Sequence, residues 1–543
     1  LNFVIQGNEV TNLEKIIGHT LPLKGAYAIS GTLTDPKAKN YKVNDLALKL
    51  GENNLTGWLE LNISGKQMAL STDLAAPQFT LQPLTIPALE TLGRIEDLGP
   101  LKLGARLVGS AKKFALENLD LNMGSEQLIA VMIKGAIKDL SAVKGLNLEF
   151  VVRGNDLASF EKLGGPILPF QEPFDLTGQF TDPTPKVYRT SSLKANFGDN
   201  DISGWVELNF SKERPLVKAE LSSQELDLRP LLAKAEREDT AAPSLQNNGK
   251  VYPSEPFQLE GLKAMDANIK LRNKHVLLPK IALNDVILDV LLDNGNLLVK
   301  PFTFIIGGGN ADIQFDLHLQ DTPPTMTLVN VIDDLDLGLM YDELGYPRTF
   351  EGKLHTDIRL SGRGASVAEL MAGLNGGIYS TMNNGRMDSQ YLDLLQKYLG
   401  SNVLQLLNPF KSQEQYSRIN CSVNQIDIKD GLAEVKLLLD NEQTSILGVG
   451  DVNLKTEALN LGIKPTPKKG FGLSGIGGVS FSFKDLSQPF RLGGTLAKPS
   501  LVLDPGGTAF TVAKAAGALA LFPLIGPVGL AAFFADVSVG KQD

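Results

Sequence analysis

The side chains that could perform catalysis or bind a metal are few and scattered in this sequence. The candidates are four histidines and one cysteine: His19, His275, His318, His355 and Cys421. No histidine has a second histidine, a cysteine or a carboxylate at the spacing that a metal site requires. Cys421 has no nearby histidine or basic residue to stabilise a thiolate, so we interpret it as a small buried hydrophobic residue. His318 and His355 alternate with apolar residues, which places them on the solvent face of strands.

Two glycine-rich segments are further candidates, because glycine loops can bind phosphate. Residues 307–309 and 472–478 lack the lysine of a phosphate-binding loop, and neither opens a strong helix. They are typical of turns or bulges. The sequence also shows no Gly-x-Ser-x-Gly motif and no convincing pair of catalytic carboxylates. It therefore predicts a protein that is not an enzyme and that has no metal or cofactor.

The composition is that of a folded protein. Of the 543 residues, 43% are hydrophobic and 21% are charged. The net charge is -9 and no run of lysine or arginine stands out, so we expect no nucleic-acid partner. The single cysteine excludes an internal disulfide but leaves the cellular compartment open.

A long internal repeat organises the first part of the chain. LGENNLTGWLELNIS at residues 50–64 nearly recurs as FGDNDISGWVELNFS at residues 197–211, and each copy holds one of the two tryptophans, Trp58 and Trp205. The same offset of 147 residues aligns LNFVIQGNEVTNLEK at the start with LEFVVRGNDLASFEK at residues 148–162. Such a unit is too long for a typical solenoid repeat and indicates a duplicated set of strands. We expect residues 1–147 to be a first β-repeat unit that has lost its beginning, and residues 148–232 to be a second.

Strict alternation of apolar and polar residues indicates half-buried β-strands, because successive side chains of a strand point to opposite faces. Both tryptophans fall on the polar face, where they are expected to cover a strand pair or to lie at a surface boundary. Residues 313–319, 354–360 and 435–439 show the same alternation. The apolar candidates for a binding face are Leu55, Leu59, Leu61, Ile63, Ile202, Val206, Leu208, Phe210, Ile313, Phe315, Leu317, Leu354, Ile358 and Leu360.

Tight turns between these strands predict a mainly β fold of antiparallel meanders with few helices. Asn294-Gly295 and Asp430-Gly431 are examples of the turn signals. A long sheet with one apolar face must cover that face. It can pack on another sheet, close on itself, or curl into a trough that a ligand with apolar chains would fill, and the strand pattern alone does not choose between these.

The second part of the chain is expected to contain a linker, a further β region and an apolar cap. Residues 233–256 are polar and predict a flexible linker or loop. Residues 257–508 form the second β region, with helices near 366–374, where Ser366 and Glu369 make a capping box, and near 388–399. Residues 509–543 predict an apolar helical cap, and residues 509–535 are long enough and apolar enough to touch a membrane as an alternative.

Several of these segments resemble the AsmA family. FRLGGTLAKPSLVLD at residues 490–504 and the apolar segment after it look like the family's C-terminal end. RLSGRGASVAELMAGLNGGIYSTMNNGRMD at residues 359–388 places Gly362, Gly364, Ser366, Leu374, Gly376 and Gly385 where the family's motif has them. The duplicated unit resembles the family's repeated β-segments, so the resemblance covers most of the chain.

The resemblance implies a long, curled antiparallel sheet, a taco-like open groove whose apolar inner face holds the acyl chains of phospholipids. It also implies a periplasmic protein that is anchored in the inner membrane, here through an N-terminal segment missing from the sequence, and that helps to move lipid towards the outer membrane. A repeated one-sided strand set would lengthen such a groove without a new fold.

Other functions are weighed against this hypothesis. A non-catalytic scaffold or assembly factor for outer-membrane biogenesis would fill the groove with its own side chains. A transmembrane β-barrel shares the alternating pattern, but the aromatic content of 7%, the internal helices and the polar linker count against it. An enzyme is the weakest alternative, because no catalytic constellation is visible.

Overall fold

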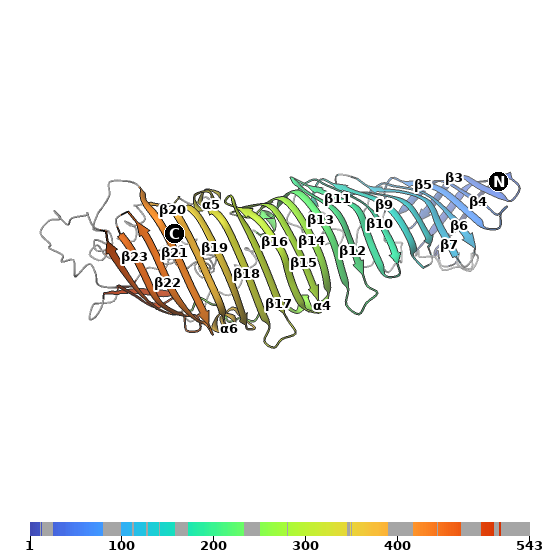
Figure 1. Cartoon of the computed structure of the whole chain (residues 1–543). Helices are drawn as coiled ribbons and strands as arrows, with labels where there is room; N and C mark the ends of the chain where they lie inside the picture. Colours follow the sequence, from blue (N-terminus) through green and yellow to red (C-terminus); the bar gives the residue numbers. More distant parts are fainter. Residues whose placement is uncertain are drawn as a thin grey trace. The chain divides into compact units, whose positions relative to one another are not determined.

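The structure is a computed structural model of the chain. It describes residues 1–10, 12, 25–79, 99–110, 113–125, 127, 129–140, 142–157, 172–232, 250–279, 281–344, 348, 350–388, 416–442, 444–468, 490–503 and 510–511. The chain divides into two compact units, Leu1–Lys234 and Ala235–Asp543. We call them unit 1 and unit 2 (Figure 1).

Unit 1 is one antiparallel meander in which each strand pairs with the next along the chain. Its strands are β1 (Asn2–Gly7), β2 (Tyr27–Lys37), β3 (Asn40–Leu50), β4 (Asn53–Asn62), β5 (Met68–Ala76), β6 (Leu101–Ser110), β7 (Lys113–Gly124), β8 (Ala130–Asp139), β9 (Lys144–Gly154), β10 (Phe174–Thr184), β11 (Val187–Phe197), β12 (Asn200–Asn209) and β13 (Leu216–Asp227).

Unit 2 continues the same plan, and its strands also pair antiparallel in chain order. They are β14 (Asp266–Leu277), β15 (Ala282–Asp293), β16 (Asn296–Ile306), β17 (Gly309–His318), β18 (Thr325–Asp336), β19 (Phe350–Arg363), β20 (Asn375–Asp388), β21 (Tyr416–Lys429), β22 (Leu432–Asn441), β23 (Thr444–Asn453), β24 (Ala458–Pro467), β25 (Phe490–Thr495), β26 (Lys498–Leu503) and β27 (Phe510–Thr511). The described helices are the short α4 (Glu260–Ala264), α5 (Leu337–Glu343) and α6 (Val367–Ala372).

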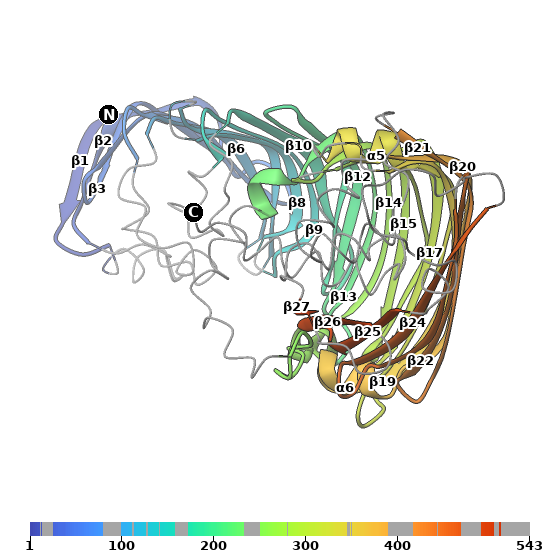
Figure 2. The same ribbon diagram turned by 90° about the vertical axis from the view of Figure 1, so that its left-hand side faces the viewer.

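In each unit the strands form an open arrangement that is not closed on itself. Among the described residues, no strand ladder joins β1 to β13 or β14 to β27. The prediction of a mainly β, antiparallel, open sheet with a few short helices is confirmed. Within unit 2 the strands bend, so that one face of the sheet is concave (Figure 2).

β-Bulges with a left-handed residue help to bend the strands. Asp45 in β3 and Ser192 in β11, which are equivalent in the repeat, both have φ of 50° and interrupt the strand register. The residue after each bulge pairs with a glycine of the next strand: Leu46 pairs with Gly57, and Leu193 pairs with Gly204. The two glycines have φ of 155° and 142°. A Cβ on Gly204 would lie 2.0 Å from the carbonyl oxygen of Glu220, so only glycine fits there. Such bulges increase local bend and twist, and the repeat reproduces them.

Helix α6 lies where the sequence predicts a helix near 366–374. The Ser366 hydroxyl accepts a hydrogen bond from the Glu369 N–H at 3.2 Å, as an N-cap does. In a capping box the Glu369 carboxylate would accept a hydrogen bond from the N–H of residue 366. Here it accepts from the Ala365 N–H instead. The helix predicted near 388–399, most of the linker at 233–256 and the cap at 509–543, except strand β27, lie outside the described residues.

Candidate functional site: the inner faces of the two units

The register of the ladders shows which side chains share a face. In unit 2, Phe315 pairs with Val299 and with Leu328, so these three side chains lie side by side on one face. Leu328 pairs in turn with Leu360 of β19. We call this face, and the corresponding apolar face of unit 1, the inner face. The opposite face is the outer face.

All the apolar residues singled out from the sequence lie on the inner faces. In unit 1 the register aligns Leu59 with Val43 and Thr72, and Leu208 with Tyr188 and Val217. Inner-face residues of unit 1 from the prediction are Leu55, Leu59, Leu61, Ile63, Ile202, Val206, Leu208 and Phe210; those of unit 2 are Ile313, Phe315, Leu317, Leu354, Ile358 and Leu360.

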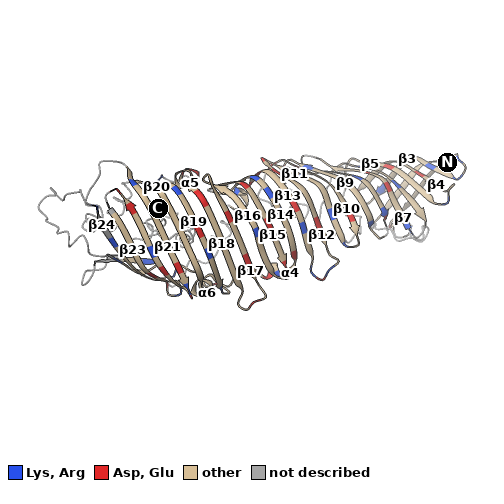
Figure 3. Ribbon diagram, viewed as in Figure 1, with Lys and Arg blue, Asp and Glu red and all other residues tan. Residues whose placement is uncertain are grey.

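The outer face is more exposed to solvent than the inner face. In β22, Ala433, Val435 and Leu437 are buried, whereas Glu434 and Lys436 between them are exposed. Charged residues of both signs are spread along the strands of each unit, without one dominant cluster (Figure 3). The alternation that the sequence shows is therefore an alternation of faces in the structure.

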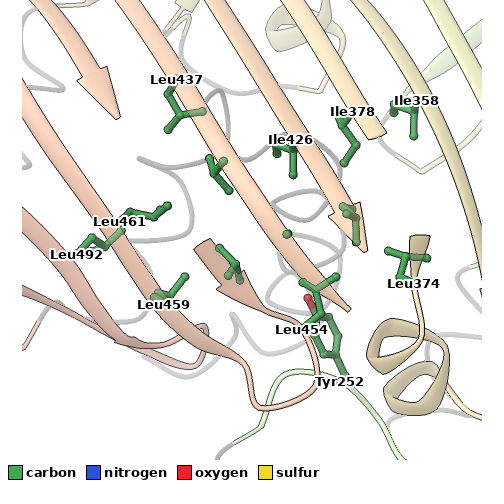
Figure 4. Close-up of a cluster of buried hydrophobic side chains, with 14 residues drawn as sticks. Tyr252, Ile358, Leu374, Ile378, Ile426, Leu437, Leu454, Leu459, Leu461 and Leu492 are labelled. Carbon is green, nitrogen blue, oxygen red and sulfur yellow. The ribbon is translucent and has the colours of Figure 1, made fainter. Parts of the chain in front are cut away.

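The inner face of unit 2 is densely packed near α6. A cluster of buried side chains comes from successive strands β19 to β25, with Ile358, Ile378, Ile426, Leu461 and Leu492 among them (Figure 4). Each such side chain contributes roughly 1.5–3 kcal/mol when fully buried. This part of the inner face is a hydrophobic core in its own right.

The buried carboxylate of Glu457 lies at the edge of this cluster. Glu457, in the turn between β23 and β24, is 1% exposed and accepts hydrogen bonds from the Val251 N–H at 2.7 Å and the Tyr252 N–H at 3.0 Å. The Tyr252 ring packs into the cluster. Burial, with the nearby Glu457 charge, raises the pKa of the Tyr252 hydroxyl well above its usual range. The sequence offered no signal for this contact, because the partners are about 200 residues apart.

A second buried cluster lies near α5. It contains Leu335, Leu337, Phe350, Met382 and Ile419. Tyr341 of α5 packs against it, and burial raises the pKa of the Tyr341 hydroxyl to about 12.

A polar row separates the two clusters, and it was not predicted. Thr356, Ser380 and Asn424 pair with one another in register across β19, β20 and β21. All three are less than 8% exposed, and the Asn424 side-chain amide donates to the Ser380 hydroxyl at 3.0 Å. The sequence indicates the first member of this row, because Thr356 is a polar residue between Leu354 and Ile358 on the apolar side of the alternation.

The inner face of unit 1 is less covered at one end of its strands. Phe180 stacks on Tyr188 with ring centroids 6.0 Å apart, and Phe210 lies next to Tyr188 at 6.3 Å. Phe210 is 47% exposed and Leu208 is 38% exposed. Their repeat equivalents Ile63 and Leu61 lie at the same end of β4.

The two tryptophans lie on the outer face, as their polar-face position predicts. Trp58 lies under the Lys42 ammonium at 4.7 Å, and Trp205 lies under the Arg189 guanidinium at 4.4 Å. Lys42 and Arg189 are equivalent in the repeat. These are cation–π contacts between neighbouring strands, so the equivalent placement of each tryptophan reflects the packing of a strand pair.

The residues with catalytic chemistry are not brought together. His318 approaches Asn296 at 3.2 Å and Asp316 at 3.3 Å, and His355 pairs with Asp333, all on the outer face. Cys421 is half-buried on the outer face, so its interpretation as a buried residue is wrong. Within the described parts of the chain, no three His, Cys, Asp or Glu side chains are grouped so as to hold a metal ion.

A small cavity beside α5 does not belong to the inner face. Its volume is about 300 Å³, and charged groups including Asp336, Arg348, Glu351 and Arg386 line it. Glu351 pairs with both arginines, and Arg348 also pairs with Asp342, whose pKa it lowers. The cavity is polar and its charges compensate one another, so it does not offer a site for an apolar chain.

Over the described ranges, no helix has the length and hydropathy needed to cross a bilayer. The segment at 509–535, for which membrane contact is an alternative, lies outside those ranges apart from β27.

Comparison with known proteins gives a family match. The sequence model of the AsmA family matches residues 5–455 of the chain. The AsmA family protein YhjG of Escherichia coli (strain K12) is 24% identical over 468 residues. That alignment covers 82% of this chain and 64% of the relative, so the chain spans less than two thirds of that protein's length. No solved structure matches.

Proposed function

The chain belongs to the AsmA family, and from this membership and its apolar inner faces we propose that it binds phospholipid acyl chains. In this proposal the protein is not an enzyme. It lies in the periplasm and helps to move phospholipids between the inner and outer membranes. The inner faces hold the acyl chains, and the polar outer faces remain in water.

The observation that carries the proposal is the register of apolar residues across successive strands. In unit 2 an apolar row passes from Leu271 through Leu288 to Phe302 without a break. An acyl chain gains roughly 0.8 kcal/mol for each methylene that leaves water. Because neighbouring positions of such a row offer similar contacts, a chain can shift along it without meeting a large barrier.

Partial exposure of inner-face residues supports binding rather than a closed core. Phe315, Leu328 and Leu288 are half-buried, although they lie on the apolar face. Apolar side chains at such positions stay partly wet unless a ligand covers them. A covering acyl chain would remove this surface from water.

A second function has its own support. The clusters near α6 and α5 are filled by the protein's own side chains, with Leu454 and Ile419 only 1% exposed. This self-packing favours a non-catalytic scaffold for outer-membrane biogenesis in that part of unit 2.

Native mass spectrometry with lipid extraction separates the two. The protein is purified from bacterial cells without detergent, and bound lipid is counted per chain. We expect one or more phospholipids per chain. A folded, lipid-free protein that also takes up no phospholipid from added vesicles would refute lipid binding and favour the scaffold.

A further inference from the structure

The two long edges of the unit 1 sheet differ in charge. Because the strands alternate in direction, the turns after β2, β4, β6, β8, β10 and β12 all lie on one edge. We call it the basic edge. Each of its six turns has an exposed lysine, either in the turn or as the first residue of the next strand: Lys39, Lys66, Lys113, Lys144, Lys186 and Lys212. The regularity is notable in a chain whose net charge is -9.

Two of the acidic groups on the basic edge are already engaged within the protein. The Asp182 carboxylate accepts hydrogen bonds from the backbone N–H groups of Gly145 and Leu146. Asp139 pairs with Lys113 at 3.3 Å and accepts from a backbone N–H, and both contacts lower the pKa of Asp139. Asp35 and Glu213 are exposed acidic groups on the same edge, and the ammonium groups at the other five turns outnumber them.

The opposite edge carries acidic groups at several of its described turns, although one of them, Asp227, pairs with Arg229. Its turns after β3 and β11 carry Glu52 and Asp199, and Glu225 and Asp227 lie at the end of β13. The two edges therefore differ in which charge recurs, since a lysine recurs at every turn of the basic edge only.

Exposed apolar side chains of the inner face lie next to these lysines. Tyr41 and Ile63 are each 41% exposed, and Phe210 is 47% exposed. The Ile63 N–H donates to the Lys39 carbonyl at 2.9 Å, and the Phe210 N–H donates to the Lys186 carbonyl at 2.8 Å. The repeat thus places an uncovered apolar side chain beside a lysine twice, at equivalent positions.

This juxtaposition fits an amphiphile with an anionic head. An ammonium group binds phosphate as a point charge. A lipid tail is about 15 Å long, half the hydrocarbon thickness of a bilayer. From the basic edge it would cover about five residues of a strand at ~3.3 Å each. At β12 that stretch runs from Phe210, just after the strand, past Leu208 to Val206, and it ends before Gly204, which pairs beside the bulge of β11.

We propose that anionic glycerophospholipids bind to unit 1 with their phosphate groups along the basic edge and their acyl chains on the adjoining inner face. This proposal rests on the proposed function, since it assigns an orientation and a headgroup class to the bound lipid. Successive turns on this edge are two strands apart, about 10 Å. Each lipid in a row therefore meets at least one lysine.

The test compares two triple variants of equal charge in the full chain. K39Q/K66Q/K186Q removes lysines from the basic edge. K49Q/K102Q/K194Q removes exposed lysines from the outer face of the same unit and serves as the matched control. Each protein is incubated with vesicles of equal amounts of phosphatidylglycerol and phosphatidylethanolamine and re-isolated. Bound lipid is then extracted and quantified by mass spectrometry.

We expect the ratio of bound phosphatidylglycerol to phosphatidylethanolamine to fall about fivefold in the edge variant for each lysine that a lipid loses, because the phosphate of phosphatidylethanolamine is already balanced by its own ammonium group and that of phosphatidylglycerol is not. The control should keep the wild-type ratio, and total lipid per chain should change little in either variant. An equal ratio in the two variants would overturn the proposal while leaving lipid binding intact. Loss of vesicle co-sedimentation with an unchanged ratio would overturn it in favour of docking to a bilayer surface. A wild-type chain that takes up no lipid would instead refute the proposed function itself.

Discussion

Replacing one inner-face leucine by aspartate should remove lipid, whereas the same change three residues later should not. Leu288 lies on the inner face, between Leu271 and Phe302 in the register. Leu291 lies in the same strand on the outer face and is 44% exposed. The pair Leu288→Asp and Leu291→Asp is thus matched in chemistry, strand and charge, and differs only in the face.

The size of the effect follows from the two choices open to the new carboxylate at position 288. If the carboxylate stays hydrated, an acyl chain must leave about three or four methylenes uncovered around it, which costs roughly 2–3 kcal/mol. If the chain covers the carboxylate, desolvation of the charge costs several kcal/mol. The affinity for lipid at this position should therefore fall by at least about 30-fold.

The assay is the number of phospholipids per chain and the apparent affinity of each variant for added phospholipid. Leu288 is only half-buried, so the lipid-free variant can keep its carboxylate wet and should fold. Circular dichroism and the midpoint of thermal unfolding check this for both variants. Equal loss of lipid from Leu288→Asp and Leu291→Asp, with both folded, would refute the assignment of the inner face.

Three further predictions concern the framework that shapes this face. Glu457→Ala leaves two buried N–H groups without their acceptor and should lower the free energy of unfolding by about 2–4 kcal/mol in denaturant titrations, with Glu457→Gln losing less. Gly204→Ala should cost roughly 2–4 kcal/mol, because its Cβ meets a carbonyl oxygen at 2.0 Å, whereas Gly462→Ala, with its nearest contact at 3.5 Å, should cost under about 1 kcal/mol. Hydrogen bonding to Lys468 lowers the pKa of Asp440 to about 2. The ionised Asp440 therefore stabilises the folded protein above the unfolded pKa of about 4, and this stabilisation is lost as the pH falls towards 2. Lys468→Met should flatten this pH dependence of the free energy of unfolding.

Much of the fold could be predicted from the sequence because strand alternation is local. Residues 313–319 and 354–360 reveal their faces through a period of two, and the register confirms each face. The repeat could also be read directly, and it places Trp58 and Trp205 in equivalent strands. These features need no knowledge of which strands are neighbours.

The rest depends on contacts between distant residues. The bulges at Asp45 and Ser192 shift the alternation by one residue, and their glycine partners lie on the next strand. Glu457 binds a segment about 200 residues earlier in the chain. The row formed by Thr356, Ser380 and Asn424 becomes visible only when three strands are placed in register.

The most direct test of the central claim uses phospholipids with brominated acyl chains, which quench a tryptophan that they touch. In a Trp58→Phe/Trp205→Phe background, Phe315→Trp places the only tryptophan on the inner face, whereas the native protein has tryptophans only on the outer face. We predict strong quenching of the tryptophan at position 315 and little quenching of the native pair. Quenching of the native tryptophans without quenching at position 315 would show that the chains lie on the outer face and would contradict the account.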